Sequence, residues 1–367
     1  MTYIDIHLLK QSRDFIRSTI ARIPAMEQKP VIIAYHGDAD GCCAAYFFWK
    51  CLRCSSDFYW IATPDFDFSK AENDLASKNL SLIVFLDMPV YSRPEMIKRL
   101  SSKGYVYIYD HHLPGLYKDS EGKERVFYLN PVIHQNGKSF PAALFGWELL
   151  EDKSEFEKKI LYMALYTESW LERISLFNTF EPFQKQTLKK IAGRIHCSFL
   201  IQNDPTVHHA LNLIVKAAEN AILEEEALKD FSEYQILENI FNLIQNEKKW
   251  LLINLNSEIK RLVDPKFIIK RIESKARLCG LIASELRWSY PKLVVGIWQR
   301  WKGRFYCELR RGKDCKINLA SMVNGLHGRA AILTGGGHPA AAAFTAEEDH
   351  FFEALHQIRT FLAAGRV

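Results

Sequence analysis

Short apolar runs alternate with amphipathic segments over the first 150 residues of the chain. The runs are rich in β-branched and aromatic residues and bounded by polar residues, so they predict β-strands. Helical segments are expected between them, at residues 42–54 and from Pro94 to Ser102, where proline suits the first helical turn. The predicted strands are residues 31–36, 58–62, 82–87, 105–110 and 126–131. Strands separated by helices predict an α/β fold with a doubly wound, mostly parallel sheet.

The rest of the chain changes character twice. From about residue 139 to 262 the apolar positions follow a period of 3.6, which predicts packing helices. Later elements are expected as strands at 292–299 and 304–310 and as helices at 319–328 and from about 347 to 362. The sequence therefore predicts an N-terminal domain over residues 1–205, a helical linker over 206–263 and a smaller α+β domain over 264–367.

The composition narrows the class of protein only slightly. Of the 367 residues, 48% are hydrophobic and 25% are charged, the proportions of a soluble globular protein. The net charge of +5 permits an anionic substrate without demanding nucleic acid. The chain shows no apolar run of the ~18 residues that a membrane span needs, and its start lacks a signal-peptide layout. Eight cysteines without a regular framework favour reduced thiols, so we expect a cytoplasmic protein with no membrane partner.

Acidic and histidine residues follow three of the predicted strands. The stretch HGDADG (36–41) comes directly after the first apolar run. Asp87 ends the third strand, and Asp110, His111 and His112 follow the fourth. Because the carboxyl ends of parallel strands meet at one edge of a sheet, we expect these side chains to lie together. Carboxylate oxygens with imidazole nitrogens suit Mn²⁺ or a similar first-row ion, and this many ligands is enough for two ions.

Each of these groups also has an ordinary structural explanation. A D-x-D-G sequence after a strand is often a turn, and a lone aspartate there often caps the next helix. A His-His pair alone means little, since a second pair stands at 208–209 in a helical segment. Three strand ends of one sheet with the same chemistry are harder to explain by caps and turns, so the metal-site interpretation is favoured.

A glycine run near the end of the chain suggests an anion site. Gly335, Gly336 and Gly337 allow successive backbone N–H groups to converge, and His338 adds another donor. Pro339 is expected to begin a helix through the following alanines, which would bring a helix N-terminus to the same point. The sequence therefore predicts a phosphate-binding loop here.

The order of the motifs resembles that of the DHH phosphoesterases. HGDADG, an isolated aspartate in FLDMPV and then DHH look like the first three motifs of that family. LTGGGHPAAAAF (333–344) is similar to the GGGH signature of the accompanying DHHA1 domain, so the resemblance spans residues from about 30 to 345. It implies an Mn²⁺-dependent phosphodiesterase or phosphatase. The implied substrates are short oligonucleotides, pAp or cyclic dinucleotides, cleaved by in-line attack of a hydroxide bridging two ions.

The resemblance also implies a set of metal ligands. His36 and Asp38 would hold one ion and Asp40 the other, while Asp87 would bridge the two. Glu168 stands in ALYTESW (164–170), where the fourth motif of the family ends in an aspartate. The implied ligands are His36, Asp38, Asp40, Asp87, His111 and Glu168. In the DHH triplet, Asp110 would orient His111 as its hydrogen-bond partner. His112 would donate to the substrate phosphate, so Asp110 and His112 are the implied catalytic residues.

In the C-terminal domain the resemblance implies a substrate-binding lobe. Arg310 lies in ELRRG, similar to a short arginine segment of the family, and would clamp a phosphate with two hydrogen bonds. The implied binding residues are Arg310, Gly335, Gly336, Gly337 and His338. Ala343 replaces a usual glycine and Arg311 a usual small serine. These departures weaken a subfamily assignment more than they weaken the chemistry.

Several functions compete at this point. The expected cofactor is two Mn²⁺ ions, with Mg²⁺ or another divalent ion as the alternative; the expected partner is a short nucleic acid or nucleotide, and a homodimer stays open. A single-strand exonuclease of the RecJ type would want an added strand-binding module, for which 367 residues leave little room. A non-catalytic replication or repair scaffold is the other alternative, which the retained ligands disfavour. A pyrophosphatase of the family is disfavoured because that branch lacks GGGH.

Overall fold

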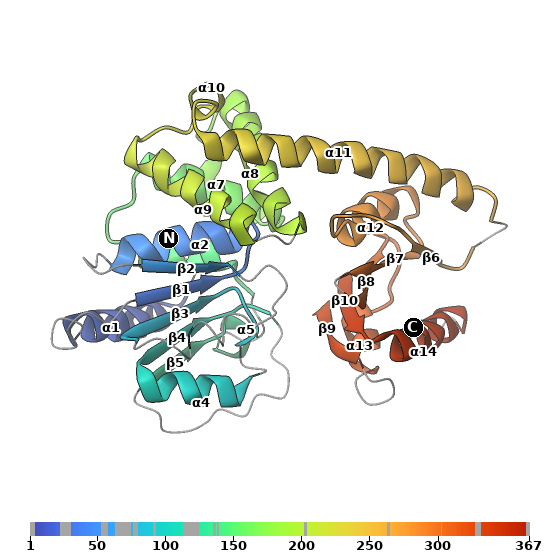
Figure 1. Ribbon diagram of the computed structural model, residues 1–367, viewed down its shortest axis with the longest axis horizontal. Coiled ribbons are helices and arrows are strands. Elements are labelled where there is room, and N and C mark those ends of the chain that lie inside the picture. The colour runs from blue at the N-terminus through green and yellow to red at the C-terminus, as the bar shows by residue number, and fades with distance from the viewer. Residues whose placement is uncertain are drawn as a thin grey trace. The chain divides into compact units, whose positions relative to one another are not determined.

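The chain folds into two compact units, Met1–Phe241 and Asn242–Val367 (Figure 1). Each has its own five-stranded sheet. The computed structural model describes residues 4–22, 31–52, 58–62, 75, 80–90, 93–112, 125–134, 137, 139–201, 204–262, 265–301, 303–326 and 332–364.

The first unit is built on a parallel sheet in the order β2-β1-β3-β4-β5, which can be followed from top to bottom in Figure 1. Its strands are β1 (Val31–Tyr35), β2 (Phe58–Ala62), β3 (Leu82–Leu86), β4 (Tyr105–Tyr109) and β5 (Val126–Leu129). All neighbouring pairs are parallel, and β1 and β3 are buried along their whole length. The strand order reverses between β1 and β3, which makes their carboxyl ends the topological switch point of the sheet. The predicted strands are thus confirmed.

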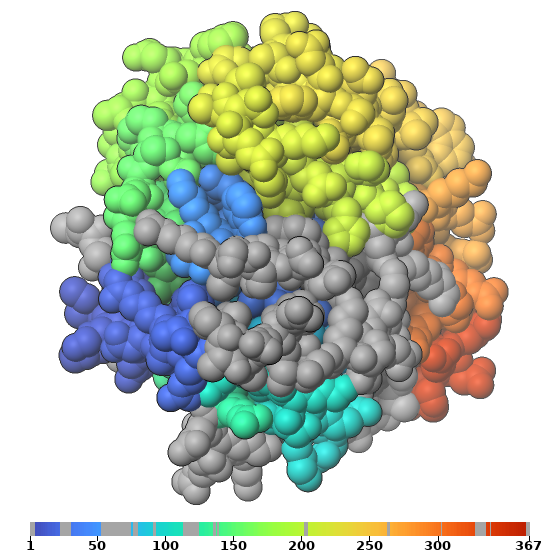
Figure 2. Space-filling view, turned by 60° about the vertical axis from the view of Figure 1, so that its left-hand side comes forward, coloured from blue at the N-terminus to red at the C-terminus, as the bar shows by residue number. Residues whose placement is uncertain are grey.

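Helices cover both faces of this sheet. Met96, Ile97 and Leu100 of α4 pack in one cluster with alternate residues of β1, β3 and β4. On the other face, Tyr107 lies against Phe48 of α2, and its hydroxyl donates to a serine of α1. Helices α1 and α4 lie at the surface in Figure 2. The α-helices described in full within the unit are α1 (Ile6–Arg22), α2 (Ala39–Leu52), α4 (Pro94–Lys103), α5 (Pro131–His134), α6 (Ala142–Leu149), α7 (Glu155–Thr167), α8 (Pro182–Ser198), α9 (Asp204–Glu219) and α10 (Glu225–Leu228).

Helix α11 (Ser232–Ile259) begins in the first unit and ends in the second. At 28 residues it is the longest helix that the structure describes. None of the helices within the described ranges combines the length and apolarity needed to cross a membrane.

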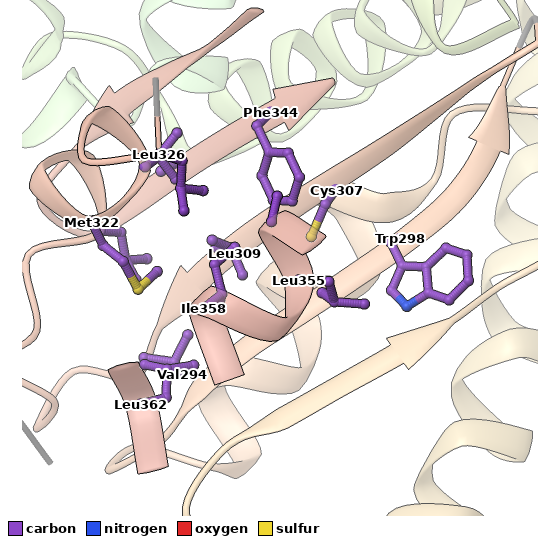
Figure 3. Packing of buried hydrophobic residues seen from close by; sticks show 14 of the residues in the cluster. Val294, Trp298, Cys307, Leu309, Met322, Leu326, Phe344, Leu355, Ile358 and Leu362 are labelled. Carbon is purple, nitrogen blue, oxygen red and sulfur yellow. The ribbon is translucent and has the colours of Figure 1, made fainter. Parts of the chain in front are cut away.

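The second unit has a mixed sheet in the order β6-β7-β8-β10-β9, in which only the pair β6–β7 is parallel. Its strands are β6 (Ile268–Arg271), β7 (Val294–Trp301), β8 (Arg304–Arg311), β9 (Ile332–His338) and β10 (Ala341–Ala346), and its helices are α12 (Cys279–Ser289), α13 (Leu319–Asn324) and α14 (Glu348–Ala363). Trp298, Phe344 and Leu355 point into a shared apolar core (Figure 3). This unit confirms the predicted smaller α+β fold.

The alanine run after the glycines is a strand, so the helix predicted from Pro339 is wrong. Residues 341–346 form β10, which pairs antiparallel with both β8 and β9. Every second residue of the run is buried, the period of a strand with one face on the core. Pro339 lies in the two-residue turn that joins β9 to β10. Gly337 has φ 144°, and a Cβ atom there would lie 2.3 Å from the carbonyl oxygen of Ala341. The GGGH sequence therefore belongs to a hairpin.

No disulfide joins the cysteines that the structure describes to one another. Cys51 is half-buried, whereas the others are buried. The buried ones are Cys42, Cys43 and Cys197 in the first unit and Cys279, Cys307 and Cys315 in the second.

Candidate metal centre

Side chains from the ends of β1, β3 and β4 meet at the carboxyl edge of the parallel sheet. His36 Nδ1 lies 3.2 Å from Asp38 Oδ2 and 3.4 Å from Asp87 Oδ2. On the other side of Asp87, His111 Nε2 lies 3.0 Å from Oδ1. These strands are neighbours in the order β1-β3-β4, so the sheet topology itself gathers residues that are up to 75 positions apart in the sequence.

Two groups of potential metal ligands share Asp87. One consists of His36, Asp38 and Asp87, and the other of Asp87, His111 and His112, with the donor atoms of each group within 4.8 Å of one another. A carboxylate that belongs to both groups and turns one oxygen toward each suits a pair of neighbouring divalent ions. The mixed oxygen and nitrogen donors suit Mn²⁺ or a similar ion.

Asp87 itself shows that the donor set fits a cation. Its side chain is buried, and Oδ1 has no well-formed hydrogen bond among the residues that the structure describes. A buried carboxylate oxygen without a donor is costly, and a bound cation would remove that cost. The backbone of Asp87 has φ 59°, in the left-handed region, while its N–H donates to the Tyr109 carbonyl at 2.9 Å. Strained backbone of this kind clusters at functional sites.

Asp38 serves both as a helix cap and as a member of the cluster. Its Oδ1 accepts a hydrogen bond of 3.0 Å from the Gly41 N–H at the start of α2, while Oδ2 faces His36. The start of α2 lies so close to the end of β1 that a Cβ atom on Gly41 would be 2.1 Å from the His36 carbonyl oxygen. The cap and ligand interpretations of the D-x-D-G sequence are therefore compatible.

Asp40 lies beside the two ligand groups rather than within them. It is fully buried, and its oxygens accept the backbone N–H groups of Ala142 (2.7 Å) and Ala143 (3.0 Å) at the start of α6. Oδ2 is also 3.9 Å from His111 Nε2. Burial, and then the charges of Asp87 and Glu168, raise the pKa of Asp40 well above its usual range. A nearby cation would offset this, and the role of Asp40 as a ligand stays a prediction.

The two histidines of the DHH triplet have different partners, and the prediction that Asp110 orients His111 is wrong. Asp110 Oδ1 is 2.7 Å from His112 Nδ1. Successive side chains of an extended segment point to opposite sides, so a residue pairs with its second neighbour more readily than with its first. Burial lowers the pKa of His112, but the Asp110 carboxylate outweighs it and raises this pKa to about 9. His112 is therefore a cation at neutral pH, with its side chain 36% exposed.

Glu168 ends α7 on the side of the cluster. The N–H of Trp170 donates to the Leu165 carbonyl (2.9 Å) and that of Ser169, at φ 56°, to the Tyr166 carbonyl (3.3 Å), which closes the helix as a Schellman turn. Burial and the charge of Asp38 raise the pKa of Glu168 to about 7, although His111 opposes the shift. This coupling places Glu168 within electrostatic reach of both ligand groups, and its role as a ligand stays a prediction.

Two residues near the cluster escaped the sequence analysis. Ser139 Oγ lies 2.8 Å from His111 Nδ1. Against burial, His36 lowers the pKa of Asp38, and His196 of α8 adds a smaller effect of the same sign. The His196 ring packs edge-on against Phe199 at 4.8 Å. A loop serine and a lone helical histidine carry no local signal, so only the fold reveals them.

The predicted substrate-binding residues lie in the second unit. Ala341 is paired with Arg310 on one side and with His338 on the other, so the three form one row across the sheet. Arg310 is engaged by Glu308 Oε2 at 2.6 Å and by Ser284 Oγ at 3.2 Å. The side chain of His338 is outside the described residues.

The glycines of the run lie next to this row on β9. Gly336 pairs with Ala343, and no heavy atom of the described residues lies within 4 Å of the place where its Cβ would be. The Arg311 guanidinium donates to the Ile317 carbonyl at 2.9 Å. The structure thus brings Arg310, His338 and the glycines to one end of the β8-β10-β9 sheet, while their role in binding stays a prediction.

Solved structures share this fold. No protein-family model matches the chain, and no curated protein matches it in sequence. RecJ from Thermus thermophilus in complex with Mn²⁺ superposes with a TM-score of 0.67 at 16% identity, over 95% of this chain and 55% of that one. An exonuclease RecJ bound to manganese gives 0.64 at 17% identity, over 95% and 94%. A DHH domain described as a member of the s1p family of ribosomal proteins gives 0.65 at 17% identity, over 97% and 91%.

These similarities concern the fold. The chain spans only about half the length of the Thermus protein but nearly the full length of the other two. Both units take part, since each alignment covers at least 95% of this chain. The chain therefore has the fold of the RecJ and DHH-domain structures, which confirms the resemblance to the DHH–DHHA1 phosphoesterases at the level of architecture.

Proposed function

We propose that the chain is a metal-dependent phosphoesterase that hydrolyses short oligonucleotides or small phosphonucleotides. The observation that carries this proposal is the pair of ligand groups joined by Asp87. The fold supports it, since the RecJ structures of similar fold were crystallised with Mn²⁺ and, in another case, with Mg²⁺. Mn²⁺ is the proposed cofactor, with Mg²⁺ as the alternative.

In the first unit, some residues would bind the metal ions and another would contact the substrate phosphate. His36, Asp38, His111 and Glu168 would hold two divalent ions with Asp87 between them and Asp40 alongside. Bound ions of this kind supply an activated water and neutralise charge on the phosphate. His112, kept cationic by Asp110, would donate to a non-bridging phosphate oxygen as charge develops on it.

Asp87→Asn tests the proposed chemistry. We expect it to lower kcat on a dinucleotide by ~10²-fold or more and to weaken Mn²⁺ binding, because the variant loses the charge shared by both groups. Glu148→Gln is the matched control, since Glu148 is a carboxylate of α6 that is equally buried but paired with Lys153. An Asp87→Asn variant with wild-type kcat would contradict the proposal.

A single-strand exonuclease is the second candidate function. It differs from the first in the length of the substrate, a long single strand instead of a short oligonucleotide. A chain of this length is compatible with an exonuclease, because an exonuclease RecJ structure is matched over 94% of its length. A panel of dinucleotides, long single strands, pAp and cyclic dinucleotides with Mn²⁺ would separate the candidates.

Arg310→Ala sharpens that comparison. An anchor for a non-reacting phosphate contributes equally before and during reaction, so its loss should raise KM about tenfold and leave kcat unchanged. The rise should be larger for a dinucleotide than for a long strand, whose further backbone contacts dilute it. Equal effects on both substrates would favour the exonuclease.

A further inference from the structure

We infer that Ser139 is a positioning residue that fixes the tautomer of His111 and so leaves His111 Nε2 available for a metal ion. This inference rests on the proposed function in one respect only, namely that a divalent ion binds at Asp87. It concerns a residue outside every motif of the sequence, 28 positions beyond the histidine that it contacts.

The hydrogen bonds of Ser139 determine the tautomer. Its Oγ lies 2.9 Å from the carbonyl oxygen of His111 and 2.8 Å from Nδ1 of the same residue. A carbonyl oxygen only accepts, so the single hydroxyl hydrogen goes to it. The Nδ1 atom must then donate to Oγ, which puts the imidazole hydrogen on Nδ1. The lone pair of Nε2, 3.0 Å from Asp87 Oδ1, is left facing the cluster.

The segment that carries Ser139 is anchored on both sides of the site. The Phe140 carbonyl accepts a hydrogen bond of 3.0 Å from the Tyr109 hydroxyl at the end of β4. Two residues further on, Asp40 accepts the N–H groups of Ala142 and Ala143. Residues 139–143 are thus fixed to β4 and to the start of α2, and this rigidity allows a hydroxyl to hold a metal ligand in one orientation.

The neighbouring histidine shows why the chemistry of the partner matters. His112 Nδ1 is paired with the buried Asp110 carboxylate, whereas His111 Nδ1 meets a neutral hydroxyl. A hydroxyl selects the tautomer without adding charge. The two adjacent imidazoles are therefore held by different partners, and the one held by Ser139 faces Asp87.

Mn²⁺ binding to Ser139 variants tests the inference, with free Mn²⁺ followed by its electron paramagnetic resonance signal. Ser139→Ala should weaken one of the two ions by ~10–100-fold and leave the other within about twofold, since His36 and Asp38 are untouched. Ser139→Thr retains the hydroxyl and should restore the affinity. Ser198→Ala is the matched control, because Ser198 is a buried serine beside the site whose hydroxyl donates to the Ile195 carbonyl at 2.7 Å rather than to a histidine.

Long-range ¹⁵N–¹H spectra of the Mg²⁺-loaded protein give a second measurement, because they show which imidazole nitrogen of His111 carries the hydrogen. If Ser139 had only a structural role, its substitution would leave this nitrogen unchanged. The wild type should show the hydrogen of His111 on Nδ1, and Ser139→Ala should lose this signature. If that variant does not fold, Ser139→Cys, with its weak donor, replaces it and should bind one ion more weakly than Ser139→Thr. Unchanged affinity and an unchanged tautomer overturn the inference alone. A wild type that binds no divalent ion at all overturns the proposed function with it.

Discussion

Asp87 is the residue on which the candidate metal centre depends. Burial raises the pKa of its carboxyl, but the adjacent imidazoles of His111 and His36 outweigh this effect and hold the pKa well below its usual range. Burial lowers the pKa of His36, but the adjacent carboxylates of Asp38 and then Asp87 outweigh it and raise this pKa to about 10. In the absence of metal a proton on His36 thus takes the place of a cation. Metal binding there has to displace this proton, so Mn²⁺ affinity should rise with pH.

Glu168→Gln should affect stability and metal binding in opposite directions. The pKa of Glu168 is raised from 4.5 to about 7, so between these values the folded state keeps a proton that the unfolded chain has lost. The stability contributed by this group is therefore present below pH 4.5 and is lost as the pH rises through about 7. The variant cannot ionise, so its metal-free Tm should exceed that of the wild type at about pH 8 and match it at about pH 4.

The same substitution should weaken Mn²⁺ binding by ~10–100-fold at about pH 8. Calorimetry at the two pH values and an Mn²⁺ titration check both expectations. Glu172→Gln is the control, because Glu172 is an exposed carboxylate shortly after Glu168 in the chain. If Glu168→Gln behaves like this control in both measurements, Glu168 is an ordinary surface residue.

At the scale of elements, the sequence predicts the strands well and fails where tertiary context decides. Runs such as 82–87 are apolar almost throughout because parallel strands are buried on both faces, and this pattern is unambiguous. The run after Pro339 has a strong helical signal, since alanine is the best helix former. Pairing with β8 and β9 overrides it. The hydrogen-bond partners of His111 and His112 could not be predicted in the same way. Asp110 pairs with His112 because their side chains point to the same side of the chain after β4, and His111 pairs with Ser139, which lies 28 positions away. No local sequence pattern shows either contact.

The start of α2 tolerates only glycine at position 41. Gly41→Ala would place a Cβ atom 2.1 Å from the His36 carbonyl oxygen, so helix and strand would have to separate. We expect a loss of about 3 kcal/mol or more in the free energy of unfolding, together with loss of Mn²⁺ binding. Gly336→Ala is the matched substitution in open space and should cost less than about 0.5 kcal/mol. Denaturant melts of both variants decide the point, and similar losses would show that the close approach is not real.

The end of α9 offers a stabilising change. Ala221 has φ 54° in a Schellman turn, where the Ile222 N–H donates to the Ala217 carbonyl at 2.9 Å. A left-handed conformation costs alanine roughly 1–2 kcal/mol, whereas glycine adopts it freely at some cost in unfolded-state entropy. Ala221→Gly should therefore raise the free energy of unfolding by about 0.5–1 kcal/mol. Glycine would be unfavourable at the helical Ala218 by a similar amount, so Ala218→Gly should show the opposite sign in the same denaturant melts.

For the whole molecule, both ligand groups lie in the first unit, and the second has its own apolar core. Mn²⁺ should therefore stabilise only the first unit, by ~2.7 kcal/mol for each bound ion at a concentration of about 100 Kd. Scanning calorimetry with and without Mn²⁺ should show one transition that moves and one that does not. Phe351→Ala, which empties a buried site in the second unit, should shift only the other transition. If Mn²⁺ shifted both transitions equally, the units would not unfold independently.

Each unit contains buried cysteines whose reaction with a thiol reagent can report transient opening of that unit. Three buried cysteines lie in each unit, and Cys51 is the one half-buried thiol among the described residues. An alkylating reagent reacts with a buried thiol only when the surrounding structure opens, so the labelling rate measures the opening free energy at that point. Of these seven thiols, Cys51 should react first. Pulse labelling read by mass spectrometry would then follow Cys42 and Cys307 in one sample. Mn²⁺ should slow the labelling of Cys42 and leave Cys307 unchanged, which would map how far protection by the metal extends through the chain.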